Sequence, residues 1–206
     1  MERNKYYSFV RMILISKEYY LFNKVTAFFS YKKNHPLHWS FKKLLLYKKI
    51  SMKTIGLNQQ EVQLVLPLLE NFLASENVLN LKIRNYHWNV TGAHFSEYHK
   101  YFEELYDDSA ENIDEIAERI RMLGSKTKAS MGYFLEKSFL MEEVNTDVSA
   151  DEMIKNLLTD TEKTISEMRN AIEIISETND SGSEDFLIAL MQKHEKNAWM
   201  LRSMAQ

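Results

Sequence analysis

The stretch from His87 to Glu118 reads HWNVTGAHFSEYHKYFEELYDDSAENIDEIAE, and the rest of the chain is interpreted around it. From Ser96 to Met122 there is neither Gly nor Pro, and apolar or small residues recur at the spacing of one helix face. These positions are Phe102, Leu105, Tyr106, Ser109, Ile113, Ile116, Ala117 and Ile120. The spacing predicts one long helix that carries many carboxylates.

Two pairs of metal-ligand side chains lie four residues apart on this helix, so each pair projects from one face: His99 with Glu103, and Asp114 with Glu118. Glu103 and Asp114 are roughly 16 Å apart along the helix axis, at about 1.5 Å of rise per residue. One straight helix therefore cannot close both pairs on one ion. A second, antiparallel copy across a two-fold axis would bring the His99 pair opposite the Asp114 pair, which predicts a dimer with two equal sites.

His87 lies before the Gly92 turn and adds a further imidazole to the same cluster. Imidazole and carboxylate without thiolate favour iron, manganese or zinc, and iron is our first choice. The alternative for any single pair is a solvated face, because exposed helices are commonly rich in Glu and Asp. Two pairs together with His87 favour the metal site.

The composition indicates one all-helical domain. The chain has 206 residues with five Gly, two Pro and no Cys, and strand-like alternation is almost absent. The lack of Cys excludes disulfides and thiolate sites and is compatible with a reducing cytoplasm, where we expect the protein, with nucleoid association as an option. No apolar run approaches the roughly 20 residues of a membrane span.

Charge divides the chain at Met52. Residues 1–51 carry 11 Lys and Arg against two acids, whereas residues 52–206 carry 15 basic and 27 acidic residues, a net charge of −12. One interpretation of 1–51 is a basic, aromatic-rich arm for nucleic acid or an acidic membrane surface. The interpretation that we favour is that translation begins at Met52, so that 1–51 is absent from the native product or disordered and 52–206 forms the four-helix domain.

The helix signals in residues 52–206 predict two hairpins. Asn58 is a plausible N-cap, Pro67 predicts a break, and Ser149 with Glu152 forms a capping box. The expected elements are a short piece at 57–65, long helices at 68–90, 96–122, 149–178 and from 183 onward, and a short helix at 131–140. This order predicts an all-α, ferritin-like four-helix bundle whose long crossover carries the short helix between the second and third long helices.

Two longer motifs resemble the Dps proteins, the mini-ferritins named for DNA protection in starved bacterial cells. They are KIRNYHWNVTGAHF at residues 82–95 and FEELYDDSAENIDEIAERI at 102–120, and the resemblance covers roughly 52–206. It implies a hollow dodecamer with ferroxidase sites shared across the two-fold interface. The implied iron ligands are His87, His99 and Glu103 from one subunit and Asp114 and Glu118 from its mate. Many relatives have Asp where Glu103 stands.

The within-subunit di-iron site of larger ferritins uses Glu-x-x-His on two helices. No His of this chain has Glu three positions before it, so that site is not expected in its usual form. We assign His94 and His194 to structure, and Met191, Met200 and Met204 to core packing.

The resemblance implies oxidation of Fe(II), preferably by hydrogen peroxide, and deposition of ferric oxide-hydroxide inside the cage. It also implies that Trp88, next to His87, accepts an oxidising equivalent; the alternative is that Trp88 packs in the core. An acidic iron-entry pore is expected near the last turn, and the candidates there are Glu177, Asp180, Glu184 and Asp185. The alternative for this group is that it is solvated and caps a helix.

The leading hypothesis is therefore an iron-oxidising, iron-storing homo-oligomer that protects DNA and cell by removing both Fe(II) and peroxide. One alternative is a DNA-compacting nucleoid protein whose metal site is secondary. Another is a helical interaction module without metal.

DNA binding is predicted to depend on residues 1–51. The net charge of −12 on residues 52–206 should repel phosphate, whereas the net charge of +9 on residues 1–51, repeated in each subunit, should attract it. In a gel-shift assay at low salt, the 52–206 protein should leave duplex DNA unshifted and the 1–206 protein should retard it. A shift by the shorter protein would contradict the charge argument.

Overall fold

The computed structural model describes residues 55–206, and the basic extension at 1–51 lies outside the described residues. Four long helices and one short helix form this part, and no strand occurs in it: α4 (Gln59–Asn89), α5 (Phe95–Met122), α6 (Met131–Lys137), α7 (Ala150–Ser176) and α8 (Ser181–Met204). The predicted all-α bundle is confirmed. None of the helices described at 55–206 combines the length and apolarity that crossing a membrane requires.

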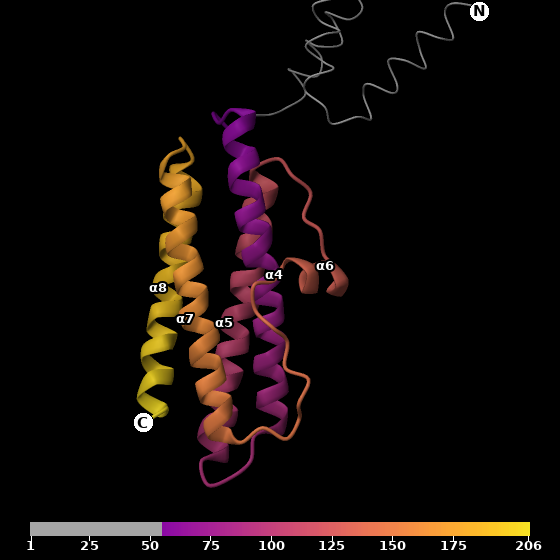
Figure 1. Ribbon diagram of the computed structural model, residues 1–206, viewed down its shortest axis with the longest axis vertical. Coiled ribbons are helices and arrows are strands. Elements are labelled where there is room, and N and C mark those ends of the chain that lie inside the picture. Colours follow the sequence, from indigo (N-terminus) through magenta and orange to yellow (C-terminus); the bar gives the residue numbers. More distant parts are fainter. Residues whose placement is uncertain (1–54) are drawn as a thin grey trace, which may run out of the picture. The chain divides into compact units, whose positions relative to one another are not determined.

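The helices form two hairpins, as the sequence predicted. Helix α4 packs along α5, and α7 packs along α8. The crossover between the hairpins runs the length of the bundle and carries α6, which lies against α4 on the outside (Figure 1). The expected long connection with its short helix is therefore confirmed.

Capping residues set where α4 and α7 begin. The Asn58 side chain accepts the Glu61 amide at 3.0 Å, and the Glu61 carboxylate accepts the Asn58 amide at 2.8 Å. The bond from the Asn58 amide, followed by one from the Asn179 side chain, stabilises the ionised carboxylate and lowers the pKa of Glu61. Ser149 and Glu152 repeat the arrangement at the start of α7. Both predicted caps are confirmed.

The break predicted at Pro67 is wrong, because α4 continues through it from Gln59 to Asn89. A proline in a helix removes one amide donor and leaves the carbonyl four residues earlier, that of Gln63, without its helical partner. Gln63 and Pro67 are both exposed, so solvent can take the place of that donor. A different face of α4, which carries Val62, Val65 and Leu69, is buried in the bundle, and this packing stabilises the helix through the proline.

The last helix begins at Ser181, two residues before the expected start. Asp180 is its N-cap and accepts the Ser183 amide at 3.0 Å and the Ser183 hydroxyl at 2.6 Å. The same carboxylate pairs with Arg119 of α5 at 2.6 Å, and Asp180 is only 2% exposed. The turn between α7 and α8 is thereby joined to α5.

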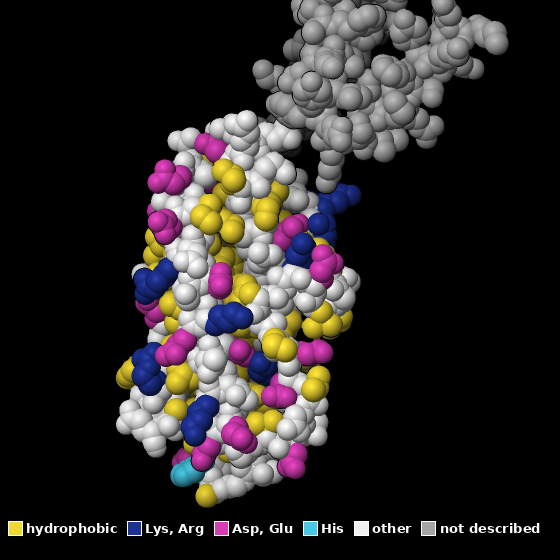
Figure 2. Space-filling model, in the orientation of Figure 1, with side chains coloured by type: hydrophobic (Ala, Val, Ile, Leu, Met, Phe, Trp, Pro, Cys, Tyr) yellow, Lys and Arg dark blue, Asp and Glu magenta, His cyan; other side chains and the backbone are white. Residues whose placement is uncertain are grey.

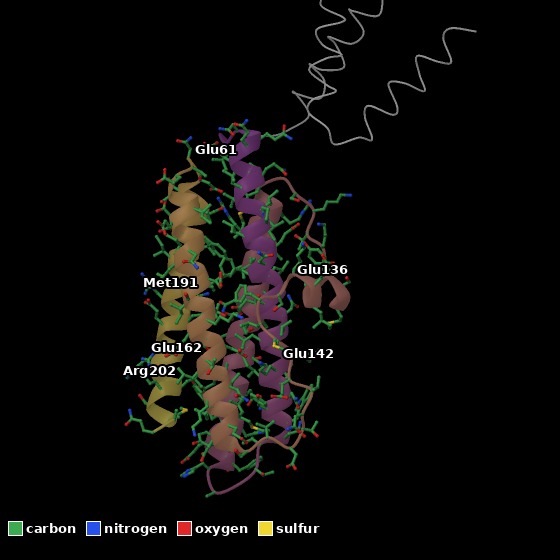
Figure 3. All side chains as sticks on the ribbon, viewed as in Figure 1. Glu61, Glu136, Glu142, Glu162, Met191 and Arg202 are labelled. Carbon is green, nitrogen blue, oxygen red and sulfur yellow. The ribbon has the colours of Figure 1, made fainter. Side chains whose placement is uncertain are left out.

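Apolar side chains fill the space between the helices in two clusters. One centres on Leu69, Phe72 and Ile116, and the other on Ile83, Phe102 and Leu157. On the face shown in Figure 2, acidic and basic side chains are interspersed rather than separated into areas of one sign. Figure 3 labels one ion pair of the α7–α8 hairpin. The Oε1 atom of Glu162 on α7 lies 2.7 Å from the Nη2 atom of Arg202 on α8.

Replacing Pro67 with Ala should stabilise the protein, because it restores a helical amide donor at an exposed position. We expect a gain of about 1–3 kcal/mol, reduced by the greater flexibility of the unfolded chain. Thermal unfolding of the assembled protein measures it, and Gln63→Ala in the same turn is the control, expected to change stability by less than about 0.5 kcal/mol. A lower melting temperature for Pro67→Ala would show that the proline makes a stabilising contact that outweighs the lost amide donor.

Candidate metal centre

Two of the predicted ligands, His87 and His99, meet at the end of the α4–α5 hairpin. His87 lies in the last turn of α4 and is 8% exposed, and His99 lies in the second turn of α5. The chain reverses between them at Gly92, whose φ of 110° is one that side chains rarely allow. The short turn therefore brings side chains from two antiparallel helices into contact.

Each histidine ring binds the backbone of the other. Nδ1 of His87 lies 2.8 Å from the carbonyl oxygen of His99, and Nδ1 of His99 lies 2.9 Å from the carbonyl oxygen of His87. A carbonyl only accepts, so Nδ1 carries the hydrogen in both rings. The rings are stacked with centroids 3.8 Å apart and planes at 22°. Both Nε2 atoms are consequently left with a free lone pair, the form in which imidazole binds metals.

Tyr106, two helical turns after His99 on α5, supports this pair. Its ring stands edge-on to His87 with centroids 5.2 Å apart, and the Arg84 guanidinium lies 4.0 Å above the ring. Asn80 accepts from Arg84 at 2.9 Å and donates to the Tyr106 carbonyl at 2.7 Å, which ties the three residues together. Desolvation raises the pKa of Tyr106, with the nearby charge of Glu103 as the next cause. The phenol therefore stays protonated beside the histidines.

Glu103 lies one turn after His99 on the same face of α5 and is exposed. The Tyr106 hydroxyl approaches its carboxylate at 3.5 Å, the outer limit of a hydrogen bond. The carboxylate is therefore oriented only weakly by its own chain. It stays free to turn toward an ion held by the two Nε2 atoms.

Asp114 and Glu118 lie farther along α5, and both are exposed. Asp114 is 15 residues beyond His99, which corresponds to about 22 Å along the helix. Within residues 55–206, no three His, Asp or Glu side chains come together as a group that could hold a metal ion. The structure of one chain thus brings two of the five predicted ligands into contact and leaves the Asp114 pair apart.

The side chain of Trp88 is 66% exposed. The alternative interpretation from the sequence, that Trp88 packs in the core, is therefore wrong. Two further large apolar side chains near the end of the hairpin are also exposed, Leu81 by 46% and Phe95 by 44%. We call Leu81, Trp88 and Phe95 the apolar rim of the histidine pair.

The four pore candidates surround the turn between α7 and α8 but differ in their surroundings. Asp180 is buried and bonded to Arg119 and Ser183, as described above. Glu177 is the exposed C-cap of α7. Glu184 lies in the first turn of α8, and Asp185, the next residue, is exposed. Glu177, Glu184 and Asp185 therefore remain candidates for contact with incoming cations, whereas the carboxylate of Asp180 is engaged within the chain.

Sequence reasoning missed the supporting residues Asn80, Arg84 and Tyr106. Asn80 and Arg84 are four residues apart on α4, so their side chains could have been expected to touch. The contact of Arg84 with Tyr106 joins different helices, and neither periodicity nor spacing indicates it.

Comparison with known proteins places this geometry in a class. The family model for the ferritin-like domain matches residues 67–206, which include all five predicted ligands. The class is therefore that of ferritin-like domain proteins.

Relatives make the assignment narrower. A low temperature-induced protein of Nostoc sp. is 42% identical over 150 residues, which are 72% of this chain and 84% of that protein. DNA protection during starvation protein 2 of Bacillus anthracis is 38% identical over 68% of this chain and 94% of its own length. A Dps protein from Vibrio cholerae, described as a ferritin-like diiron-carboxylate protein, matches with a TM-score of 0.72 and 30% identity over 76% of this chain and 99% of its own. The chain belongs to the Dps family.

Replacing His99 with Ala should loosen the end of the α4–α5 hairpin, because the stacked ring and its Nδ1 bond to the His87 carbonyl are lost, while the bond from His87 to the backbone carbonyl of residue 99 can remain. We expect a loss of about 1–3 kcal/mol of stability and faster proteolysis at residues 90–94. His94→Ala removes the exposed histidine of the same turn and should change stability by less than about 0.5 kcal/mol. Equal effects of the two substitutions would contradict a structural role for the reciprocal bonds.

Proposed function

We propose that the protein oxidises Fe(II) at sites shared by two subunits and stores the ferric product in a dodecameric cage. The observation that carries the proposal is the histidine pair, whose two Nε2 atoms are free while both Nδ1 atoms are engaged. Two imidazoles and Glu103 make half of an iron site. Asp114 and Glu118 of a second chain, antiparallel to the first, would supply the other half.

The apolar rim supports this choice of partner. Leu81, Trp88 and Phe95 are exposed on the α4–α5 hairpin. Trp88 follows His87 in the chain, and the Phe95 ring stacks on His99 with centroids 5.1 Å apart. A second copy docked at this face would remove their apolar surface from water. The same copy would bring its Asp114 and Glu118 carboxylates to the imidazoles of the histidine pair. Burial of apolar surface and completion of the metal site therefore favour the same antiparallel dimer. A two-fold axis makes the contact reciprocal and yields two equal sites per dimer.

The residues divide the work at this site. The imidazoles, held in one tautomer, bind Fe(II) without adding charge. Glu103, Asp114 and Glu118 add negative charge, which favours Fe(III) over Fe(II) and so lowers the cost of removing an electron. Two Fe(II) ions give up one electron each, hydrogen peroxide accepts both as its O–O bond breaks, and hydrolysis of the ferric ions releases protons. Ferric oxide-hydroxide then accumulates inside the cage.

Two further assignments belong to this proposal. Trp88 adjoins His87 and lies at the surface that the partner would cover, so it is placed to accept an oxidising equivalent. Glu184 and Asp185 are our candidates for the acidic pore, with Glu177 nearby, because their carboxylates concentrate cations. Asp180 acts as the cap that positions this turn.

Protection of DNA, the property in the name of the Bacillus anthracis relative, would follow here from chemistry rather than from contact. Residues 52–206 carry a net charge of −12, which disfavours phosphate. Removal of Fe(II) and peroxide together prevents their reaction to hydroxyl radical.

Mixing two inactive variants tests the shared site. His99→Gln disables the imidazole half, and Asp114→Asn with Glu118→Gln disables the carboxylate half. Each cage alone should oxidise Fe(II) with added peroxide at a small fraction of the wild-type rate. After the two variants are unfolded and refolded together, half of the dimers should be mixed with one intact site each, so about one quarter of the activity should return.

The control refolds each variant by itself, and size-exclusion chromatography verifies the cages. No recovery in the mixed cages, with both variants assembled, would show that the ligands do not come from two subunits. Runs with oxygen alone and with peroxide under nitrogen identify the oxidant.

Tyr106 supplies a second test, read from metal affinity. Tyr106→Leu removes the ring beside His87 and Arg84 and should weaken binding of Zn²⁺, a redox-silent probe, by about 10-fold or more. Tyr106→Phe keeps the ring and should lose much less. Calorimetric titration measures both, and equal affinities for Tyr106→Leu and the wild type would remove the supporting role.

A further inference from the structure

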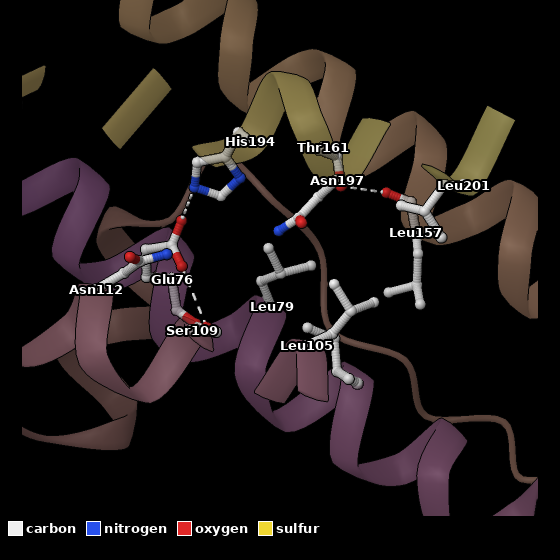
Figure 4. Close-up of a pocket in the computed structure, with 11 residues that line it drawn as sticks. Glu76, Leu79, Leu105, Ser109, Asn112, Leu157, Thr161, His194, Asn197 and Leu201 are labelled. Carbon is white, nitrogen blue, oxygen red and sulfur yellow. Dashed lines mark hydrogen bonds and ion pairs between the residues drawn. The ribbon is translucent and has the colours of Figure 1, made fainter. Parts of the chain in front are cut away.

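A second histidine–carboxylate pair lies inside the bundle, apart from the histidine pair at its end. Glu76 on α4 is 1% exposed and His194 on α8 is 3% exposed. Glu76 lies 11 residues before His87, which corresponds to about 16 Å along α4. Figure 4 shows the carboxylate and the imidazole facing each other from different hairpins.

The contact of these two groups does not satisfy their bonding capacity. Oε1 of Glu76 and Nε2 of His194 are 2.8 Å apart. Their relative orientation does not meet hydrogen-bond geometry, and both atoms lack a hydrogen-bond partner within the described part of the chain. Polar atoms buried in this way destabilise a fold unless something else binds them. The arrangement therefore points to an occupant that both atoms can reach.

The second carboxylate oxygen is already held. Ser109 of α5 donates its hydroxyl to Oε2 of Glu76 at 3.1 Å, which fixes the plane of the carboxylate and leaves Oε1 toward His194. A hydrogen bond to the far oxygen of a ligating carboxylate is a common support of metal sites.

The space beside the pair has room for one atom. Glu76, Ser109, His194 and Asn197 line a cavity of about 20 Å³. A volume of roughly 10–15 Å³ holds one water, so the cavity is too small for an organic ligand. Leu79, Ile83, Leu105, Leu157 and Leu201 form its apolar wall. The Asn197 amide points into this space in Figure 4.

We infer that the cavity is a site for a single divalent transition-metal ion, bound by Glu76 and His194 with the Asn197 amide oxygen as a further donor. One carboxylate, one imidazole and an amide are donors of intermediate softness that suit Fe²⁺, Zn²⁺ or Co²⁺. Lys193, the residue before His194, donates to Asn112 at 3.2 Å and to Glu115 at 2.9 Å, which compensates its charge. The inferred site is separate from the proposed ferroxidase centre and adds to it.

Co²⁺ is the probe, because its visible absorption reports coordination by nitrogen and oxygen. The assembled His99→Gln, Asp114→Asn, Glu118→Gln protein, in which both halves of the ferroxidase centre are disabled, is freed of metal and titrated. It should bind about one Co²⁺ per subunit. Adding Glu76→Gln or His194→Asn should abolish that binding. Adding His94→Ala with Glu97→Gln, an exposed pair with Nδ1 and Oε2 2.9 Å apart, should leave it unchanged.

Absence of tight Co²⁺ binding in the His99→Gln, Asp114→Asn, Glu118→Gln protein overturns the inference, and that result needs no substitution at Glu76 or His194. Binding that survives Glu76→Gln and His194→Asn in folded cages also overturns it, as does binding lost with the exposed pair. Iron oxidation that persists in the Asp114→Asn, Glu118→Gln protein would contradict the proposed function alone, because the Co²⁺ result is read separately.

Discussion

The reciprocal bonds between His87 and His99 are the constraint on which the candidate centre depends. A helix ends with carbonyl groups that have no partner in the helix, and the His87 carbonyl is one of them. The His99 ring satisfies it, and the His87 ring contacts α5 in the same way. The interaction that closes the hairpin is thus also the one that fixes the tautomer of both rings. Stability and chemistry share the same atoms, which limits how either histidine can be replaced.

Ion pairs also join the two hairpins across a largely apolar interior. Lys82 of α4 pairs with Asp160 of α7 at 2.5 Å, and Arg119 of α5 pairs with Asp180 before α8. Apolar side chains pack well in several registers, whereas a buried charge is tolerated only opposite its partner. These pairs therefore favour one register of the hairpins. The position of Asp114 and Glu118 relative to His99 is set separately, by α5, which carries all three residues.

Local chemistry made the helices and the histidine pair predictable from the sequence. Asn58, Ser149 and Gly92 act within a few residues of their own positions, so their effects could be inferred before the fold was known. The break predicted at Pro67 was wrong because solvent can bind the free Gln63 carbonyl and the buried face of α4 stabilises the helix, which together outweigh the missing amide donor. The exposure of Trp88 and the burial of Glu76 against His194 depend on neighbours from distant parts of the chain. Periodicity carries no information about those neighbours.

The Gly92 turn has a consequence for the order of events in the cell. The two histidines are close in sequence, so the imidazole half of the centre needs only a local loop closure and can form early in folding. The carboxylate half, in the proposed function, arrives with another molecule. Newly made subunits would then be catalytically silent, and the oxidation of iron would begin only at concentrations that sustain assembly.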